Sequence, residues 1–66
     1  MWKFAEGESV ITEVDWLPST ELIVIKQGAG YKKNKKNVEV LDHLSYFLVD
    51  KNGKMYYFWE HQLKGM

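Results

Sequence analysis

The chain has no cysteine, no arginine and only one proline among its 66 residues. Without cysteine it has no disulfide framework, and its two histidines alone fall short of a closed zinc site. We therefore expect no metal and no other cofactor. A lack of cysteine is also typical of a reducing compartment, so we expect a cytoplasmic protein.

Long apolar segments are missing as well. The longest apolar runs, Leu22–Ile25 and Met55–Trp59, are far too short to span a bilayer. The first residues, Met1–Glu8, lack the apolar stretch and the small-residue cleavage site of a secretion signal. Apolar side chains nevertheless make up 45% of the chain and charged ones 27%, which is typical of a folded soluble domain. We expect one domain over residues 1–66 and no membrane segment.

Charge is balanced overall but divided along the chain. Nine acidic residues cancel nine lysines. Residues 1–21 hold five acids and one lysine, whereas residues 22–41 hold five lysines and one acid. Because the chain has no guanidinium group, sequence-specific reading of base edges would lack its most common side chain.

Periodicity predicts β structure in the first half of the chain. Alternation and β-branched residues predict strands over 9–14 and 21–26, with a break at the only proline between them. The polar segment 27–37 is expected to be a long loop. The alternation of Val38–Val40 favours a further strand, although Asn37 is also able to cap a helix there.

The second half of the chain predicts a β-hairpin. Two strand-like runs, 44–50 and 55–59, flank Asn52-Gly53, a dipeptide whose residues both tolerate positive φ. A single turn of helix over 60–63 and a frayed end over 64–66 follow. About five short strands with a closing helical turn indicate an all-β fold, and we expect a small barrel.

Two motifs carry a resemblance to a known family. The opening Phe4–Val10 has the Phe-x-x-Gly-acid-x-Val pattern of many SH3-like small barrels. The ending, Tyr46–Asp50, then Gly53, then Tyr57–Leu63, is similar to their closing hairpin and most similar to small prophage-encoded proteins of YorP type. The resemblance implies an SH3-like barrel of phage or mobile-element origin in the cytoplasm of a host cell. It further implies a binding module, which we expect to act by protein–protein interaction with a host protein.

The hairpin suggests a surface for such a partner. A two-residue loop at Asn52-Gly53 places Leu48 opposite Tyr57 and Phe47 opposite Phe58. The more apolar face, expected to be the core, carries Leu44, Tyr46, Leu48, Met55, Tyr57 and Trp59. The other face carries the predicted binding strip for a partner protein or a second copy: Phe47, Val49, Tyr56 and Phe58.

Two structural alternatives remain for this strip. Either the segment 27–37 or the Trp2–Phe4 segment could cover it. A three-residue turn with a bulge at Gly53 would shift the pairing and exchange the partners across the hairpin.

A different class of partner is indicated by the basic segment. An aromatic ring for base stacking and four cations for phosphates occur together in the predicted loop, namely Tyr31, Lys32, Lys33, Lys35 and Lys36. Nucleic-acid binding is thus the alternative function, although lysine-rich loops are often only solvated. A self-associating structural subunit is the second alternative.

Nothing in the sequence predicts catalysis. His43 and Ser45 would share one face of a strand, but a chain of this length has little room for a pocket and an oxyanion site. His61 is expected to form local hydrogen bonds. The segment around Gly28 and Gly30 lacks the lysine and hydroxyl spacing of a phosphate-binding loop. We therefore expect no enzyme and no catalytic residue.

Overall fold

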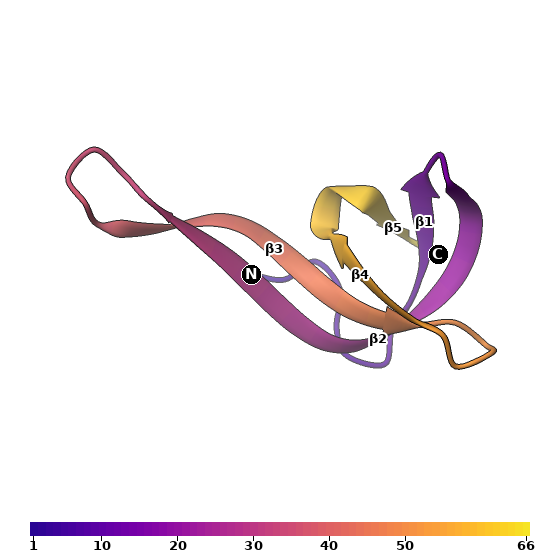
Figure 1. The fold of residues 1–66 in the computed structure, drawn as a ribbon. Coiled ribbons are helices and arrows are strands. Elements are labelled where there is room, and N and C mark those ends of the chain that lie inside the picture. The colour runs from indigo at the N-terminus through magenta and orange to yellow at the C-terminus, as the bar shows by residue number, and fades with distance from the viewer.

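The structure, a computed structural model, describes the backbone of residues 1–66 and every side chain except that of Pro18. The molecule is elongated, with extents of 44 × 24 × 19 Å. The two edges of the sheet lie in a curled body, and a two-stranded ribbon projects from this body (Figure 1). No helix in the described part of the chain has the length and apolar character needed to cross a membrane.

Five antiparallel strands and one short helical turn make up the fold. They are β1 (Ser9–Val14), β2 (Leu17–Lys33), β3 (Glu39–Val49), β4 (Met55–Trp59), the 3-10 turn η1 (Glu60–Gln62) and β5 (Leu63–Gly65). The strands form one sheet in the order β4-β3-β2-β1-β5. The all-β prediction is therefore confirmed. The edge strands β4 and β5 are not paired with each other, so the sheet is open and the expected barrel is not confirmed, although the arrangement is compatible with an SH3-like fold.

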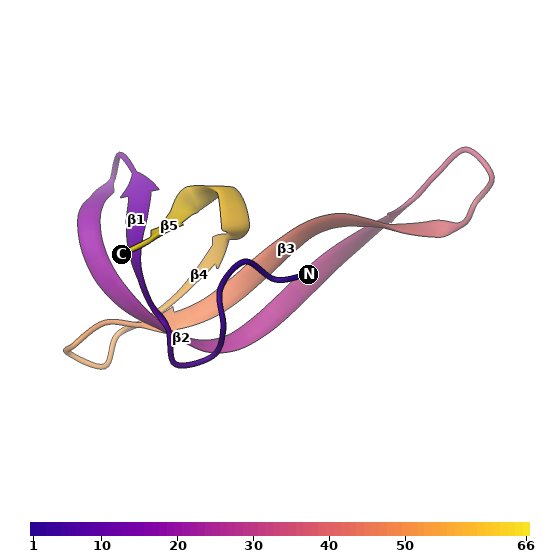
Figure 2. The same ribbon diagram turned by 180° about the vertical axis from the view of Figure 1, so that it is seen from behind.

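Strand β2 links the two halves of the sheet. Its first part pairs with β1, where Ser9 lies opposite Ile23, and its later part pairs with β3 as far as Lys33 opposite Glu39. Strand β4 covers β3 only from Ser45 onward, so residues 29–44 extend beyond the body as a two-stranded ribbon. We call residues 29–44 the arm. Two opposite views show it standing clear of the body (Figures 1 and 2).

The predicted loop over residues 27–37 is therefore wrong for most of its length, because β2 continues to Lys33. Gly28 and Gly30 lie on β2, where the lack of a side chain permits close pairing with β3. A Cβ atom on Gly30 would lie 2.0 Å from Cε1 of His43, and one on Gly28 would lie 2.9 Å from Oγ of Ser45. Side chains of β3 thus occupy the space that residues of β2 leave empty. The predicted frayed end is also wrong, since β5 extends to Gly65.

The β3–β4 turn fixes the register of the closing hairpin. The Oδ1 atom of Asp50 accepts hydrogen bonds from the backbone N–H groups of Asn52 and Lys54, both at 2.9 Å. Asp50 and Lys54 also pair through the backbone, and Gly53 has a φ of 85°. The loop therefore has three residues with a left-handed glycine in third place. This is the alternative with Gly53 at a bulge, and the two-residue loop that we expected is wrong.

The longer loop moves every cross-strand pair by one residue. Tyr46 lies opposite Phe58, and Leu48 lies opposite Tyr56. A one-residue shift turns each side chain of β4 to the other face of the sheet. Phe58 is consequently 2% exposed, whereas Tyr57, which we expected in the core, is 48% exposed. Met55 and Trp59 are exposed for the same reason.

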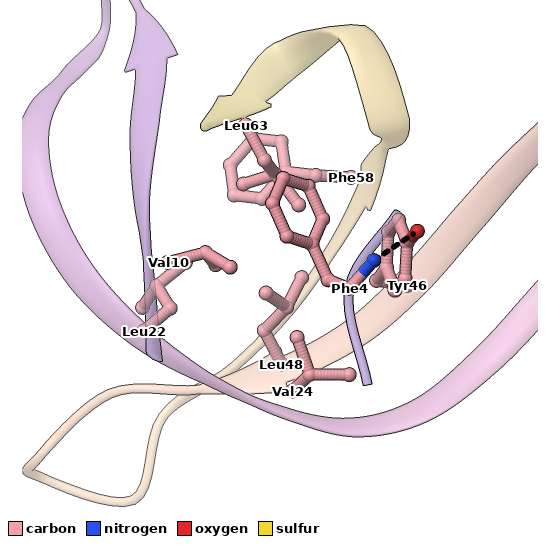
Figure 3. Packing of buried hydrophobic residues seen from close by; sticks show 8 residues of the cluster. All are labelled: Phe4, Val10, Leu22, Val24, Tyr46, Leu48, Phe58 and Leu63. Carbon is pink, nitrogen blue, oxygen red and sulfur yellow. Dashed lines mark hydrogen bonds between the residues drawn. The ribbon is translucent and has the colours of Figure 1, made fainter. Parts of the chain in front are cut away.

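The core lies inside the curl of the sheet. It is formed by Phe4, Val10, Leu22, Val24, Tyr46, Leu48, Phe58 and Leu63 (Figure 3). The Tyr46 hydroxyl accepts a hydrogen bond from the backbone N–H of Phe4 and donates one of 2.6 Å to Oε2 of Glu60. The N-terminal segment is thereby fixed to the sheet, and Nε1 of Trp2 extends this attachment by donating to the carbonyl of Gly28. We call the core side of the sheet the inner face and the opposite side the outer face.

Candidate nucleic-acid interface

The lysines of the basic segment lie together at the distal end of the arm. Lys32 and Lys33 end β2, and Lys35 and Lys36 lie in the turn that follows. All four are exposed. Among the described side chains, the one ion pair that involves them joins Lys32 Nζ to Oδ1 of Asp42 at 3.5 Å. Lys33 lies opposite Glu39, but neither its ammonium group nor those of Lys35 and Lys36 form an ion pair with a described side chain.

The turn that carries these lysines is ordered by its own hydrogen bonds. The Oδ1 atom of Asn34 accepts from the backbone N–H groups of Lys36 at 2.8 Å and Val38 at 3.1 Å. Asn37 adopts a left-handed conformation with a φ of 61°. The arrangement repeats that of the β3–β4 turn, with Asn34 in the place of Asp50. The lysines thus project from a defined turn at the end of a ribbon.

Tyr31 lies in β2 beside these lysines and is 63% exposed. Strand alternation places it on the face opposite to that of Gly30 and Lys32. Its cross-strand neighbour is Leu41, which is also exposed. The structure therefore brings Tyr31 and the four predicted lysines together at the end of the arm, but on a strand and a tight turn instead of a loop.

A second cluster of rings, three of them exposed and the imidazole of His43 half-buried, lies on the outer face at the base of the arm. We call it the outer aromatic row, and it consists of His43, Phe47, Tyr57 and Trp59. The rings of Phe47 and Tyr57, which lie opposite each other, have centroids 5.0 Å apart. The rings of His43 and Trp59 stack with centroids 3.8 Å apart and an interplanar angle of 13°.

Small residues beneath the row allow its rings to lie close to the sheet. Gly28 and Gly30 place no side chain on the outer face of β2. Ser45, which lies opposite Gly28, has a small side chain that is only 1% exposed. The Cβ position of Gly28 is 3.8 Å from the ring of Phe47, and that of Gly30 falls on the ring of His43. The rings therefore cover β2 as well as the strands that carry them.

Lysines continue the outer face on both sides of the row. Lys26 lies opposite Phe47, and Lys32 shares the outer face of β2 with Gly30 by alternation. Between the row and the arm's end, Asp42 forms a hydrogen-bonded contact of 3.0 Å with Nδ1 of His43. This contact, followed by those with Lys32, lowers the pKa of the Asp42 carboxyl below its ordinary value. Asp42 is thus charged and engaged by its two neighbours at neutral pH.

The division of charge along the sequence becomes a separation in space. Glu13 lies near the end of β1, and Asp15 lies in the β1–β2 turn that follows. Glu21 is in β2, opposite Ile11. That turn is at the far end of the body from the arm (Figure 1). The end of the arm therefore carries a local positive charge in a chain of zero net charge.

The predicted binding strip does not exist as one surface. Phe58 belongs to the core and Tyr56 packs against it from the inner face, whereas Phe47 and Val49 lie on the outer face. The shift of register by the three-residue turn is the cause. The predicted register consequently missed the exposure of Tyr57 and Trp59. The sequence does contain a signal for the correct register, because a hydrogen-bond-accepting aspartate such as Asp50 with glycine three residues later is typical of a three-residue turn.

In comparisons with protein-family models, curated proteins and solved structures, the chain has no significant match. No family is therefore assigned to it, and its similarity to YorP-type proteins has no support beyond the motifs themselves.

Proposed function

We propose that this chain is a nucleic-acid-binding module, not an enzyme, and that the arm contacts the phosphate backbone. The observation that carries the proposal is the group of four exposed lysines on an ordered, projecting ribbon, three of them in no ion pair with a described side chain. Phosphate contacts by lysine supply sequence-independent affinity. Tyr31 beside the lysines offers a ring on which a base can stack.

The composition supports binding without strong sequence preference. The chain has no arginine for bidentate contacts with guanine. The side-chain oxygen of Asn34 at the tip is already used by two backbone N–H groups. The polar groups at the end of the arm are therefore suited to a charged backbone more than to base edges.

Binding of a host protein, which the resemblance to prophage proteins implies, stays a prediction. The strip on which we based it includes Phe58, which is buried, and Tyr56, which packs on the core. Self-association also stays a prediction. Both differ from the present proposal in that neither requires the lysines of the arm.

The experiment is a fluorescence anisotropy titration of a labelled 15-nucleotide oligothymidine with the full chain in 50 mM salt. The test variant removes the lysines of the arm (K32S/K33S/K35S/K36S). The matched control removes four lysines elsewhere (K3S/K51S/K54S/K64S), so both variants have the same net charge. We expect the arm variant to lose most of the affinity and the control to keep most of it. The free energy of unfolding of the arm variant should stay within about 0.5 kcal/mol of the wild-type value, because exposed charges contribute little to stability. The control also removes the contacts of Lys3 and Lys54 with the rings of Phe4 and Tyr56, so circular dichroism checks that it is folded.

Two outcomes would overturn the proposal. One is a wild-type chain that binds no oligonucleotide in 50 mM salt. The other is an equal loss of affinity in the two variants, which would assign the binding to net charge instead of the arm.

A further inference from the structure

We infer that the outer aromatic row is a stacking platform for unpaired bases, so that the preferred ligand is single-stranded nucleic acid. The inference rests on the proposed function and names the class of nucleic acid. It concerns a surface separate from the lysines at the end of the arm and is carried by different residues.

The row presents accessible rings. Tyr57 is 48% exposed, and Phe47 and Trp59 are each 39% exposed, although all three lie on hydrogen-bonded strands, Phe47 on β3 and the other two on the edge strand β4. None of them belongs to the hydrophobic core. Rings held at the surface of a sheet offer their faces to a ligand at a low cost in conformational entropy, because the backbone beneath them is already ordered.

One of these rings is held in place by the residues around it. The imidazole of His43 lies over Gly30 and stacks against the indole of Trp59 at 3.8 Å. His61 approaches the same indole edge-on, with centroids 5.9 Å apart. Trp59 is therefore restricted in orientation, and His43 is a positioning residue that supports it.

Charge along the same face favours a nucleic acid over an apolar peptide. Lys26, which is exposed and forms no ion pair with a described side chain, lies opposite Phe47 within the row, and Lys32 lies farther along the outer face with its ammonium 3.5 Å from Oδ1 of Asp42. A strand whose bases stack on the rings would therefore meet ammonium groups beside its phosphates. Single-strand-binding proteins combine aromatic platforms and positive charge in this way.

Base stacking also selects against a duplex. In double-stranded nucleic acid the faces of the bases are covered by their neighbours, and only the edges are open to protein side chains. Rings fixed on a sheet stack only on bases that are already unpaired. The lysines of the arm, in contrast, contact phosphates of either form.

The experiment compares the 15-nucleotide oligothymidine with a 15-base-pair duplex for wild type, Tyr57→Ala and Trp59→Ala. The matched control is Trp16→Ala, since Trp16 is exposed on the β1–β2 turn and its ring stacks on Phe58 of the core, not on a ring of the row. We expect the wild type to bind the single strand more tightly than the duplex. Each row variant should bind the single strand about tenfold more weakly, with an unchanged salt dependence and unchanged duplex binding. Circular dichroism confirms that each variant is folded, and Tyr57→Ala keeps the test valid if Trp59→Ala unfolds.

Several results would contradict the inference. If Tyr57→Ala binds the single strand as the wild type does while the lysine variant does not, the row is not a platform and the proposed function stands. An equal loss in Trp16→Ala would show that the effect is not specific to the row. A light-scattering mass of twice 7.8 kDa that Tyr57→Ala reduces to one chain would show that a second copy covers the rings. If the arm variant K32S/K33S/K35S/K36S binds as tightly as the wild type, the proposed function itself is contradicted.

Discussion

The imidazole of His43 stacks on the indole of Trp59 with ring centroids 3.8 Å apart, although the two residues lie on different strands. The contact depends on a third residue, because the imidazole occupies the space above Gly30. A glycine that resembles loop sequence is thus the base of an ordered stack on the outer face. The stack lies where the arm leaves the body, at the end of the row that is nearer to the lysines.

The first prediction concerns Gly30→Ala. A Cβ atom there would lie 2.0 Å from Cε1 of His43, so the imidazole must leave its position on Trp59. We expect a loss of about 1–3 kcal/mol in the free energy of unfolding and a changed near-ultraviolet circular dichroism spectrum. The control is Gly65→Ala, whose Cβ would make an ordinary contact of 3.7 Å with Phe4. Equal effects of the two substitutions would show that the stack is not supported by Gly30.

The second prediction tests the register of the closing hairpin. Phe58 is 2% exposed and Phe47 is 39% exposed, so Phe58→Ala should cost about 3–5 kcal/mol and Phe47→Ala much less. Urea unfolding of the two variants measures the difference. A larger loss for Phe47→Ala would indicate the two-residue turn and the opposite assignment of faces.

The third prediction is a pH dependence at the β3–β4 turn. Hydrogen bonds from the backbone of Lys54, and further ones from Asn52 and the Tyr56 hydroxyl, lower the pKa of Asp50 below its ordinary value of 3.8. The stabilisation by its carboxylate is therefore complete above the unfolded pKa and is lost as the pH falls through the folded pKa.

Asp50→Asn tests this dependence, because an amide oxygen fills the same role at Asn34 in the other turn. We expect the variant to keep the hairpin and to lose less stability than the wild type between pH 6 and pH 3. The measurement is urea unfolding at several pH values. Parallel pH profiles for the two proteins would show that Asp50 does not contribute to the acid sensitivity.

The fourth prediction concerns Tyr46. Burial, followed by the hydrogen bond to Glu60, raises the pKa of Tyr46 to about 12. The unfolded chain would ionise this phenol near pH 10, so its contribution to stability is complete below pH 10 and is lost as the pH rises through about 12. Tyr46→Phe should remove an ultraviolet absorbance change centred near pH 12. It should also cost about 1–3 kcal/mol at neutral pH, because Glu60 and the N–H of Phe4 lose a partner. A wild-type chain without that late change would contradict the assignment.

Local patterns in the sequence predicted several elements well. The strand over 9–14 has the predicted bounds, and the closing turn is η1. These segments depend on alternation and on nearby residues, which a sequence displays directly. The length of β2 was not predictable in this way, because pairing across Gly28 and Gly30 depends on His43 and Ser45 in a distant segment.

The candidate site was predicted in part. Tyr31 and the four lysines were identified from the run of residues 31–36 alone, since the exposure of a lysine-rich segment needs no knowledge of packing. The outer aromatic row was missed because one additional residue in the turn at Gly53 decides which side of β4 faces the core. A hydrophobic pattern that is apolar on both faces, such as Met55–Trp59, does not contain that information.

The most direct test of the arm as a phosphate-binding element is the salt dependence of oligothymidine binding. Four lysine–phosphate contacts predict a slope of about −2.8 in a plot of log K against log salt concentration, or ~50-fold weaker binding in 200 mM than in 50 mM salt. The arm variant K32S/K33S/K35S/K36S should lose this contribution and keep at most the shallow slope of the contact by Lys26, and the control K3S/K51S/K54S/K64S should keep the wild-type slope. A wild-type slope retained by the arm variant would contradict the account.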